Sequence, residues 1–230
     1  MVSPMLRRSG VAVCLILELL KWRPRHVIQV GVGINHKELE VMQEAWGPCS
    51  EQWTLDGFEP NPAVAQAIRP HYPGQLMEVA IGDQKGWTRL YYRKNHKDGS
   101  SVYPLDGETV LSCEVPLATL DSLYPDPPQQ TLLWLDCEGS ELAAIRGGQH
   151  VLAHCQAVNV EMTSRPSHDG PSNTEQVHEA LTAAGFYRQW VHTSRVSAGQ
   201  SDCLYLRRGV FSPELCCCPC SITAYRSDCR

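Results

Sequence analysis

From about residue 27 to residue 208, short apolar runs alternate with segments whose apolar residues recur at helical spacing. The runs predict buried strands, and the segments between them predict amphipathic helices. This alternation is typical of an α/β fold with a mostly parallel sheet covered by helices on both faces. The predicted strands are 26–32, 53–59, 76–83, 131–136 and 157–163, and the predicted helices are 36–46, 61–69, 140–146 and 172–185.

Two further apolar segments, 186–193 and 202–208, lie close together in the sequence. Strands joined by a short connection pair antiparallel, so these segments predict an antiparallel end to the sheet. Residues 86–94 alternate and predict an extended edge or hairpin, whereas the polar, turn-rich residues 95–114 predict a long loop. A short helix is expected at 117–124, with Asp121 as its cap.

Turn and capping residues mark several helix ends. Asn61 is expected to be an N-cap, with Pro62 at the first helical position. Gly47 and Gly185 are expected to stop the helices that precede them. A capping box predicts the start of the helix at 172–185, through Ser172 and Glu175.

The N-terminal apolar run, 11–20, is interrupted by Glu18 and is shorter than the ~20 apolar residues that span a bilayer. No small-residue cleavage site follows it, so a signal peptide is not expected either. The run predicts an amphipathic helix, with a weak peripheral membrane anchor as the alternative. Its expected apolar face holds Val11, Leu15, Leu19 and Trp22.

Composition sets the size of the domain and excludes one class of partner. A chain of 230 residues with 43% hydrophobic residues is large enough for one sizeable core. The net charge of −5 and the scattered basic residues argue against a nucleic-acid partner. The expected organisation is an N-terminal helical extension at 1–25, one domain at 26–209 and a tail at 210–230.

Eleven cysteines fall into two groups. Isolated ones within apolar runs, such as Cys137 and Cys155, behave as small hydrophobic residues in a reducing compartment, which predicts a cytoplasmic location. The other group is crowded into the tail, where the spacing does not suit a zinc site. A disordered tail with reactive or lipidated thiols is expected instead; its cysteines are Cys216, Cys217, Cys218, Cys220 and Cys229.

Polar residues gather at the carboxyl ends of the predicted strands, which is where open α/β sheets bind their ligands. The first strand ends in a loop with two glycines, and acidic residues end the other four. The candidate site residues are Gly31, Gly33, Asn35, Glu59, Asp83, Asp136, Glu138 and Glu161.

The glycine loop and its acidic surroundings favour S-adenosylmethionine over a dinucleotide. A dinucleotide site uses a third glycine, but His36 stands at that place, and no basic residue offsets the acids around a pyrophosphate. S-adenosylmethionine has a ribose for Glu59 to bind, carries no phosphate and is cationic, so carboxylates attract it. A nucleotide-cofactor oxidoreductase of the NAD type is the alternative.

Four segments, "GFEPNP", "VAIGD", "VPLATLD" and "LDCEGSELAAIRGG", resemble the successive signatures of the FkbM-type S-adenosylmethionine-dependent methyltransferases. The resemblance implies the class I methyltransferase fold, a Rossmann-like sheet of seven strands with the last antiparallel. It also implies cofactor contacts from the glycine loop, from Glu59 on the ribose, from the third strand near the adenine and from Asp136 near the methionine end. The residues implied are Gly31, Gly33, Asn35, Glu59, Ala80, Ile81, Asp83 and Asp136.

One departure concerns Gln29, which stands where family members often carry an acid. It leaves a non-catalytic binding module as a further alternative. The segment 99–102 resembles a family loop that folds over the acceptor, although an ordinary surface turn fits it equally well.

The resemblance implies O-methylation of a small hydroxylated acceptor, such as a sugar or glycan. The enzyme must align this acceptor with the methyl group, and a general base assists by taking the hydroxyl proton. Asp136, Glu138 and Glu161 are the candidate catalytic residues, with Glu138 or Glu161 preferred. No metal ligand is assigned, although three acids together offer a divalent cation suitable ligands. The acceptor's identity and the oligomeric state are not encoded in these patterns.

Overall fold

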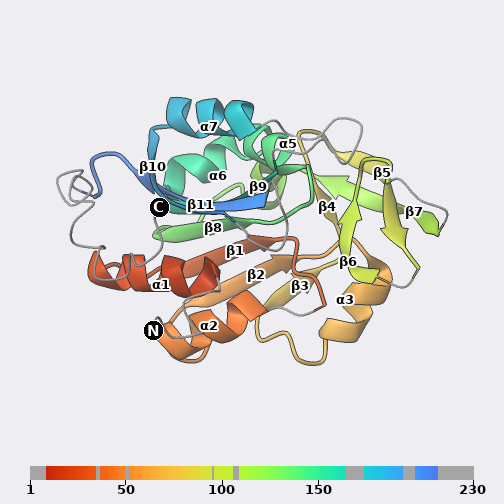
Figure 1. Ribbon diagram of the computed structural model, residues 1–230, viewed down its shortest axis with the longest axis horizontal. Coiled ribbons are helices and arrows are strands. Elements are labelled where there is room, and N and C mark those ends of the chain that lie inside the picture. The colour runs from red at the N-terminus through yellow and green to blue at the C-terminus, as the bar shows by residue number, and fades with distance from the viewer. Residues whose placement is uncertain are drawn as a thin grey trace.

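The protein's structure is a computed structural model that describes residues 9–34, 37–49, 52–94, 96–105, 109–163, 174–193 and 200–211. A large sheet runs through its centre, and a small sheet lies beside it (Figure 1). Asn35, His36 and Ser172, for which the sequence predicts roles, lie outside the described residues, as does the cysteine-rich segment 212–230.

The large sheet has seven strands in the order β10-β11-β9-β8-β1-β2-β3. Every neighbouring pair from β9 to β3 is parallel, whereas β11 is antiparallel to both β9 and β10. The predicted fold, a mostly parallel seven-stranded sheet with an antiparallel last strand, is confirmed. Its strands are β1 (His26–Val30), β2 (Thr54–Phe58), β3 (Gln75–Met77), β8 (Thr131–Leu135), β9 (Cys155–Thr163), β10 (Phe186–Thr193) and β11 (Gln200–Arg207).

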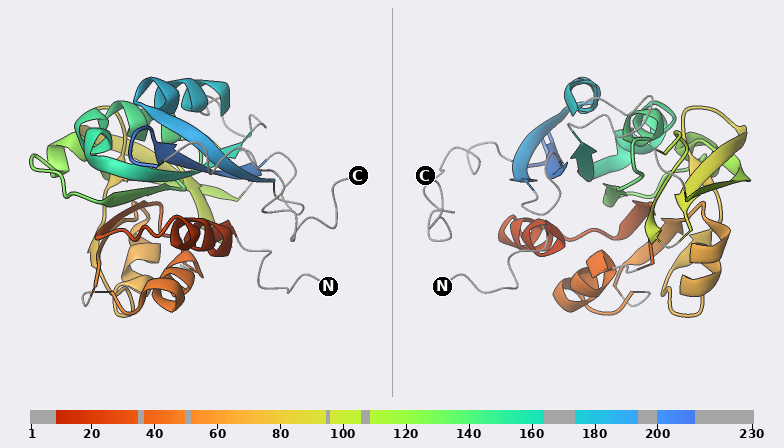
Figure 2. Two further views of the ribbon diagram at one scale, coloured as in Figure 1. Left: turned by 90° about the vertical axis from the view of Figure 1, so that its left-hand side faces the viewer. Right: turned by 45° about the vertical axis from the view of Figure 1, so that its right-hand side comes forward.

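Helices cover both faces of this sheet, as the views in Figures 1 and 2 show. One face packs against α1 (Ser9–Leu19), α2 (Lys37–Trp46) and α3 (Pro62–Ile68). The other packs against α4 (Leu120–Leu123), α5 (Glu141–Arg146), α6 (Gln149–His154) and α7 (Thr174–Ala183). The strands of the centre are buried on both sides, which explains their nearly continuous apolar sequences.

The apolar face expected for the N-terminal helix is confirmed only in part, since Val11 and Trp22 pack against the core but Leu15 and Leu19 do not. Val13 and Leu17 are fully buried in the core, whereas Leu15 is 46% exposed and Leu19 is 77% exposed. Both sides of this helix are apolar, so helical spacing alone does not decide which side faces the sheet. None of the helices in the described ranges is long and apolar enough to cross a membrane.

The small sheet has the order β4-β7-β5-β6 and corrects two expectations. The predicted strand 76–83 is divided between β3 of the large sheet and β4 (Ala80–Ile81) of the small one. The extended segment expected at 86–94 is present as β5 (Gly86–Arg93), and it pairs antiparallel with β6 (His96–Ser101). The long loop expected at 95–114 is wrong, because it holds β6 and the start of β7 (Val110–Ala118).

Capping side chains fix the helix ends. Asn61 is the N-cap of α3 as expected, and its side chain accepts a hydrogen bond from the Ala63 N–H. Asp121 does not cap its own helix, because Thr119 is the N-cap of α4. The carboxylate of Asp121 instead accepts the N–H groups of His150 and Val151 at 3.0 Å, at the start of α6. The sequence position of Asp121 suggested a cap of α4, but the fold places its carboxylate at the start of α6.

Candidate functional site

The loop after β1 depends on glycine. Gly31 and Gly33 have φ angles of 81° and 66°, in the left-handed region that glycine adopts without steric cost. A Cβ atom on Gly31 would lie 1.7 Å from the carbonyl oxygen of Asp136. Beneath the loop, the Asp136 N–H donates to the Val30 carbonyl at 2.9 Å. The glycine therefore lets the ends of β1 and β8 approach closely.

Glu59 follows β2 and is 5% exposed. Its Oε2 accepts a hydrogen bond from the Gly33 N–H, and its Oε1 accepts one from the Asn61 N–H, both at 2.9 Å. Both oxygens of the Glu59 carboxylate therefore bind backbone N–H groups. The residue expected to bind a ribose thus also joins the loops after β1 and β2.

The three residues expected near an adenine differ in their surroundings. Ala80 is 3% exposed and Ile81 is 4% exposed, and each side chain packs in a hydrophobic cluster. Asp83, just after β4, has an exposed side chain. Of the three, Asp83 is therefore the residue whose side chain is open to a ligand.

The segment after β8 forms a tight turn with two left-handed residues. Glu138 has φ 49° and Gly139 has φ 103°. Glu141 is 4% exposed, and its Oε1 accepts the N–H groups of Cys137 and Gly139, both at 3.1 Å. Burial raises the pKa of Glu141, while these backbone hydrogen bonds oppose the rise. Glu141 therefore stabilises the conformation of this turn.

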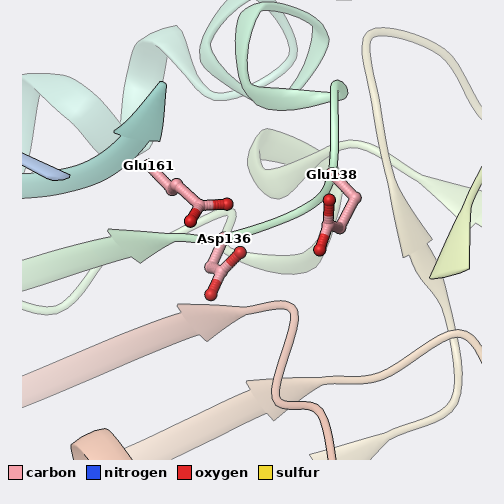
Figure 3. Close-up of side chains that lie close together, drawn as sticks. All are labelled: Asp136, Glu138 and Glu161. Carbon is pink, nitrogen blue, oxygen red and sulfur yellow. The ribbon is translucent and has the colours of Figure 1, made fainter. Parts of the chain in front are cut away.

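Three carboxylates meet at the end of the sheet (Figure 3). Asp136 follows β8, Glu138 lies in the turn and Glu161 lies on β9. Each offers an oxygen that lies within 4.8 Å of the others'. The three candidate catalytic residues are thus brought together from two strands, in an arrangement whose oxygen ligands would also suit a divalent cation.

Crowding changes the protonation of Glu161. Burial is the largest cause, and together with the nearby charges of Glu138 and Asp202 it raises the pKa of Glu161 to about 8, although a hydrogen bond with Asp136 lowers it. Several carboxylates this close cannot all be ionised without cost. Glu161 therefore exchanges its proton near neutral pH.

Asp202 belongs to this group and was missed from the sequence. It pairs with Glu161 across β11 and β9. Because β11 is antiparallel, its first residues lie at the edge where the parallel strands end. His192 on β10 lies beyond it, with Nδ1 3.9 Å from Asp202 Oδ2. The predicted antiparallel last strand could have identified Asp202, because such a strand starts at the edge where the parallel strands end.

The segment 99–101 lies against the acidic turn and not on the open surface. The Ser101 hydroxyl donates to the Glu138 carbonyl at 2.7 Å, and Ser101 is 1% exposed. Next to it, Ser100 Oγ accepts a hydrogen bond from Asn61 Nδ2 at 3.0 Å. Strand β6 of the small sheet therefore contacts both the acidic turn after β8 and the residues that follow β2.

Gln29 has a structural partner in the core. It is 2% exposed, and its side-chain oxygen accepts a hydrogen bond from the Tyr72 hydroxyl at 3.1 Å. Gly57 on the neighbouring strand makes room for this tyrosine, since a Cβ there would lie 2.2 Å from its hydroxyl oxygen. The amide that stands at the family's acidic position is thus engaged by Tyr72.

The comparisons with known proteins identify the family of the chain and agree with its fold. The family model described as "Methyltransferase FkbM domain" matches residues 29–188. No curated protein sequence matches the chain. Among solved structures, magnesium protoporphyrin IX methyltransferase from Synechocystis PCC 6803 with bound S-adenosylmethionine is similar, with a TM-score of 0.50 at 11% identity over 86% of this chain and 76% of that chain. Fibrillarin from Aeropyrum pernix has a TM-score of 0.49 at 12% identity, over 87% of this chain and 75% of that chain.

Proposed function

Because the chain belongs to the FkbM methyltransferase family, we propose that it is an O-methyltransferase for a small hydroxylated acceptor, such as a sugar or glycan. Its dependence on S-adenosylmethionine follows from the family and agrees with the fold. The acceptor class comes from the sequence resemblance. The transfer to oxygen is supported by the carboxylates at the ends of β8 and β9.

The cofactor is assigned to the ends of β1, β2 and β8. Glu59 would bind the ribose hydroxyls, as the resemblance implies, while Gly31 and Gly33 let the backbone approach the ligand. Asp136 would lie near the methionine part. Carboxylates suit this cofactor because its sulfonium and ammonium groups are positively charged. The neighbourhood of Ala80, Ile81 and Asp83 would accept the adenine.

Glu161 is the proposed general base. When bound, S-adenosylmethionine supplies an electrophilic methyl group. Glu161 would take the proton of the acceptor hydroxyl as the oxygen bonds to the methyl carbon, while the bond from that carbon to the sulfonium sulfur would break and release S-adenosylhomocysteine. A base works best when its pKa lies near the operating pH, and the pKa of Glu161 is raised to about 8. The charge of Glu138 raises the pKa of Glu161, and a hydrogen bond with Asp136 lowers it. Both carboxylates lie beside that of Glu161.

The observation that carries this proposal is the approach of the three carboxylates to within 4.8 Å. Its test is transfer of a labelled methyl group from S-adenosylmethionine to a panel of glycans and hydroxylated metabolites. Glu161→Gln should lower turnover by about 10²–10⁴-fold, the usual worth of a general base, with S-adenosylhomocysteine affinity nearly unchanged. Glu179→Gln, on the exposed side of α7, is the matched control. Equal turnover in both variants would rule out the base role.

The family match favours a methyltransferase over an NAD-type oxidoreductase, and the methyl-transfer assay separates an active enzyme from a non-catalytic module. A thermal-shift comparison separates the cofactors, since a ligand of the native state raises the melting temperature. S-adenosylhomocysteine should raise it and NAD should not. We also propose a cytoplasmic location, on the cysteine pattern described above.

A further inference from the structure

We infer that Ser101 is a positioning residue for methyl transfer, which fixes the backbone of Glu138 so that its carboxylate stays beside those of Asp136 and Glu161. The inference rests on the proposed function, because it gives Glu138 a place at the reacting end of the site. It concerns a residue of the small sheet, which supplies none of the candidate catalytic residues.

Ser101 uses its hydroxyl in both directions. Its Oγ donates to the carbonyl of Glu138 at 2.7 Å and accepts the N–H of Tyr103 at 3.2 Å. The side chain is 1% exposed, so water does not replace either partner readily. A buried hydroxyl with its donor and acceptor roles both filled holds one orientation.

The backbone that Ser101 holds is a strained one. Glu138 is a non-glycine residue with φ 49°, a left-handed conformation that is sterically unfavourable for an L-residue. Such a conformation persists only when its surroundings fix it. Glu141 fixes the residues on either side, through the N–H groups of Cys137 and Gly139. Ser101 binds the carbonyl of Glu138 itself, so the two residues together hold three consecutive residues of the turn.

The same segment connects the two halves of the site. Ser100 Oγ accepts from Asn61 Nδ2, and the Asn61 N–H donates to Glu59. Gly99, with φ 78°, lies beside the side chain of Glu138, because a Cβ there would be 3.6 Å from Glu138 Oε1. Residues 99–101 therefore join the proposed ribose-binding carboxylate to the acidic turn.

The position of Glu138 has a measurable electrostatic consequence. The groups that act on the charge of Glu161 are Glu138, Asp202, Asp136 and Glu141, and Glu138 is the strongest of the charges that raise its pKa. If the turn relaxes and the carboxylate of Glu138 moves away, Glu161 ionises more easily. The pKa of Glu161 therefore reports whether Ser101 holds Glu138 in place.

The test is a carboxyl ¹³C NMR titration of the full chain, which needs no methyl acceptor. We expect Ser101→Ala to lower the apparent pKa of Glu161 by about one unit, as for one carboxylate moving several Å away. Glu138→Gln should lower it as much, and the double variant should lower it no further. Ser101→Thr should restore the wild-type value, and Ser112→Ala, at an exposed position of β7, is the control.

A wild-type titration of Glu161 in Ser101→Ala would overturn the inference, and so would additive shifts in the double variant. If Ser101→Ala does not fold, Ser101→Cys gives the same test, because it keeps the side chain's size and weakens the donor. Calorimetry with S-adenosylhomocysteine and the methyl-transfer assay are run in parallel. Their failure in wild type would refute the proposed function, whereas the NMR result decides the role of Ser101 separately.

Discussion

The Gly33 N–H donates a hydrogen bond to Glu59 Oε2 at 2.9 Å, which joins the loop after β1 to the end of β2. The other carboxylate oxygen of Glu59 binds the Asn61 N–H at the start of α3. Glu59 is also expected to bind the cofactor's ribose. Its two hydrogen bonds therefore hold the loops around the proposed ribose site in place before a ligand binds. Such preorganisation lowers the cost of ordering the loop when the ligand binds.

Gly31→Ala should destabilise the protein and abolish S-adenosylhomocysteine binding. The alanine methyl group would lie 1.7 Å from the Asp136 carbonyl oxygen, so β1 and β8 must separate. Gly209→Ala is a matched control, because Gly209 has the same φ of 81° and nothing within 4 Å of its Cβ position. The control should lose only the ~1–2 kcal/mol of the left-handed conformation. Equal losses in denaturant unfolding would contradict the close approach at Gly31.

Stability should depend on pH through Glu161. Its native pKa is raised from the model-compound value of 4.5 to about 8, so the folded state binds the proton more strongly than the unfolded chain does. Its contribution to stability is therefore full below about pH 4.5 and is lost as the pH rises through about 8. Glu161→Gln cannot ionise and should gain stability over wild type across this window, by on the order of 1–3 kcal/mol. A difference in unfolding free energy that does not change with pH would contradict the raised pKa.

Asp202→Asn should lower the pKa of Glu161 without changing the residues of the turn. Asp202 pairs with Glu161 across the sheet, and its negative charge is one cause of the raised pKa. We expect the titration of Glu161 to move down, by less than in Glu138→Gln, because Glu138 is the stronger cause. Carboxyl ¹³C NMR measures this directly. An unchanged midpoint for Glu161 would contradict the claim that the charge of Asp202 acts on Glu161.

Methyl transfer should persist after treatment with EDTA. The proposed chemistry needs a base and an aligned acceptor, and a proton near neutral pH relieves part of the repulsion among the three carboxylates. Turnover measured before and after chelation tests this, with restoration by added Mg²⁺ or Mn²⁺ as the second arm. Loss of activity that either cation restores would make Asp136, Glu138 and Glu161 a metal site.

Buried elements of the fold follow well from sequence, because their patterns are unambiguous. The run that forms β1 is mostly apolar, and the cap at Asn61 and the stop at Gly47 mark their helices directly. Helix α1 shows where this fails: it is apolar on both sides, and only the packed sheet selects Val13 and Leu17 over Leu15 and Leu19.

The candidate site was only partly visible from sequence. Residues at the ends of parallel strands, such as Glu59 and Asp136, are found by following the strand pattern. Asp202 lies near the start of the antiparallel strand β11, so a rule for residues at the carboxyl ends of strands does not identify it. Ser101 lies in a polar segment that looks like a loop, and its contact with Glu138 depends on how the small sheet folds back.

Calorimetric titration of S-adenosylmethionine into wild type and Glu59→Ala tests the central claim most directly. Wild type should bind one equivalent. The variant should bind at least about tenfold more weakly, since hydrogen bonds to a charged group contribute roughly 1.5–3 kcal/mol each. Folding of the variant is checked by its melting temperature. No binding by folded wild type, or equal affinity in the two proteins, would contradict the assignment of the ribose to Glu59.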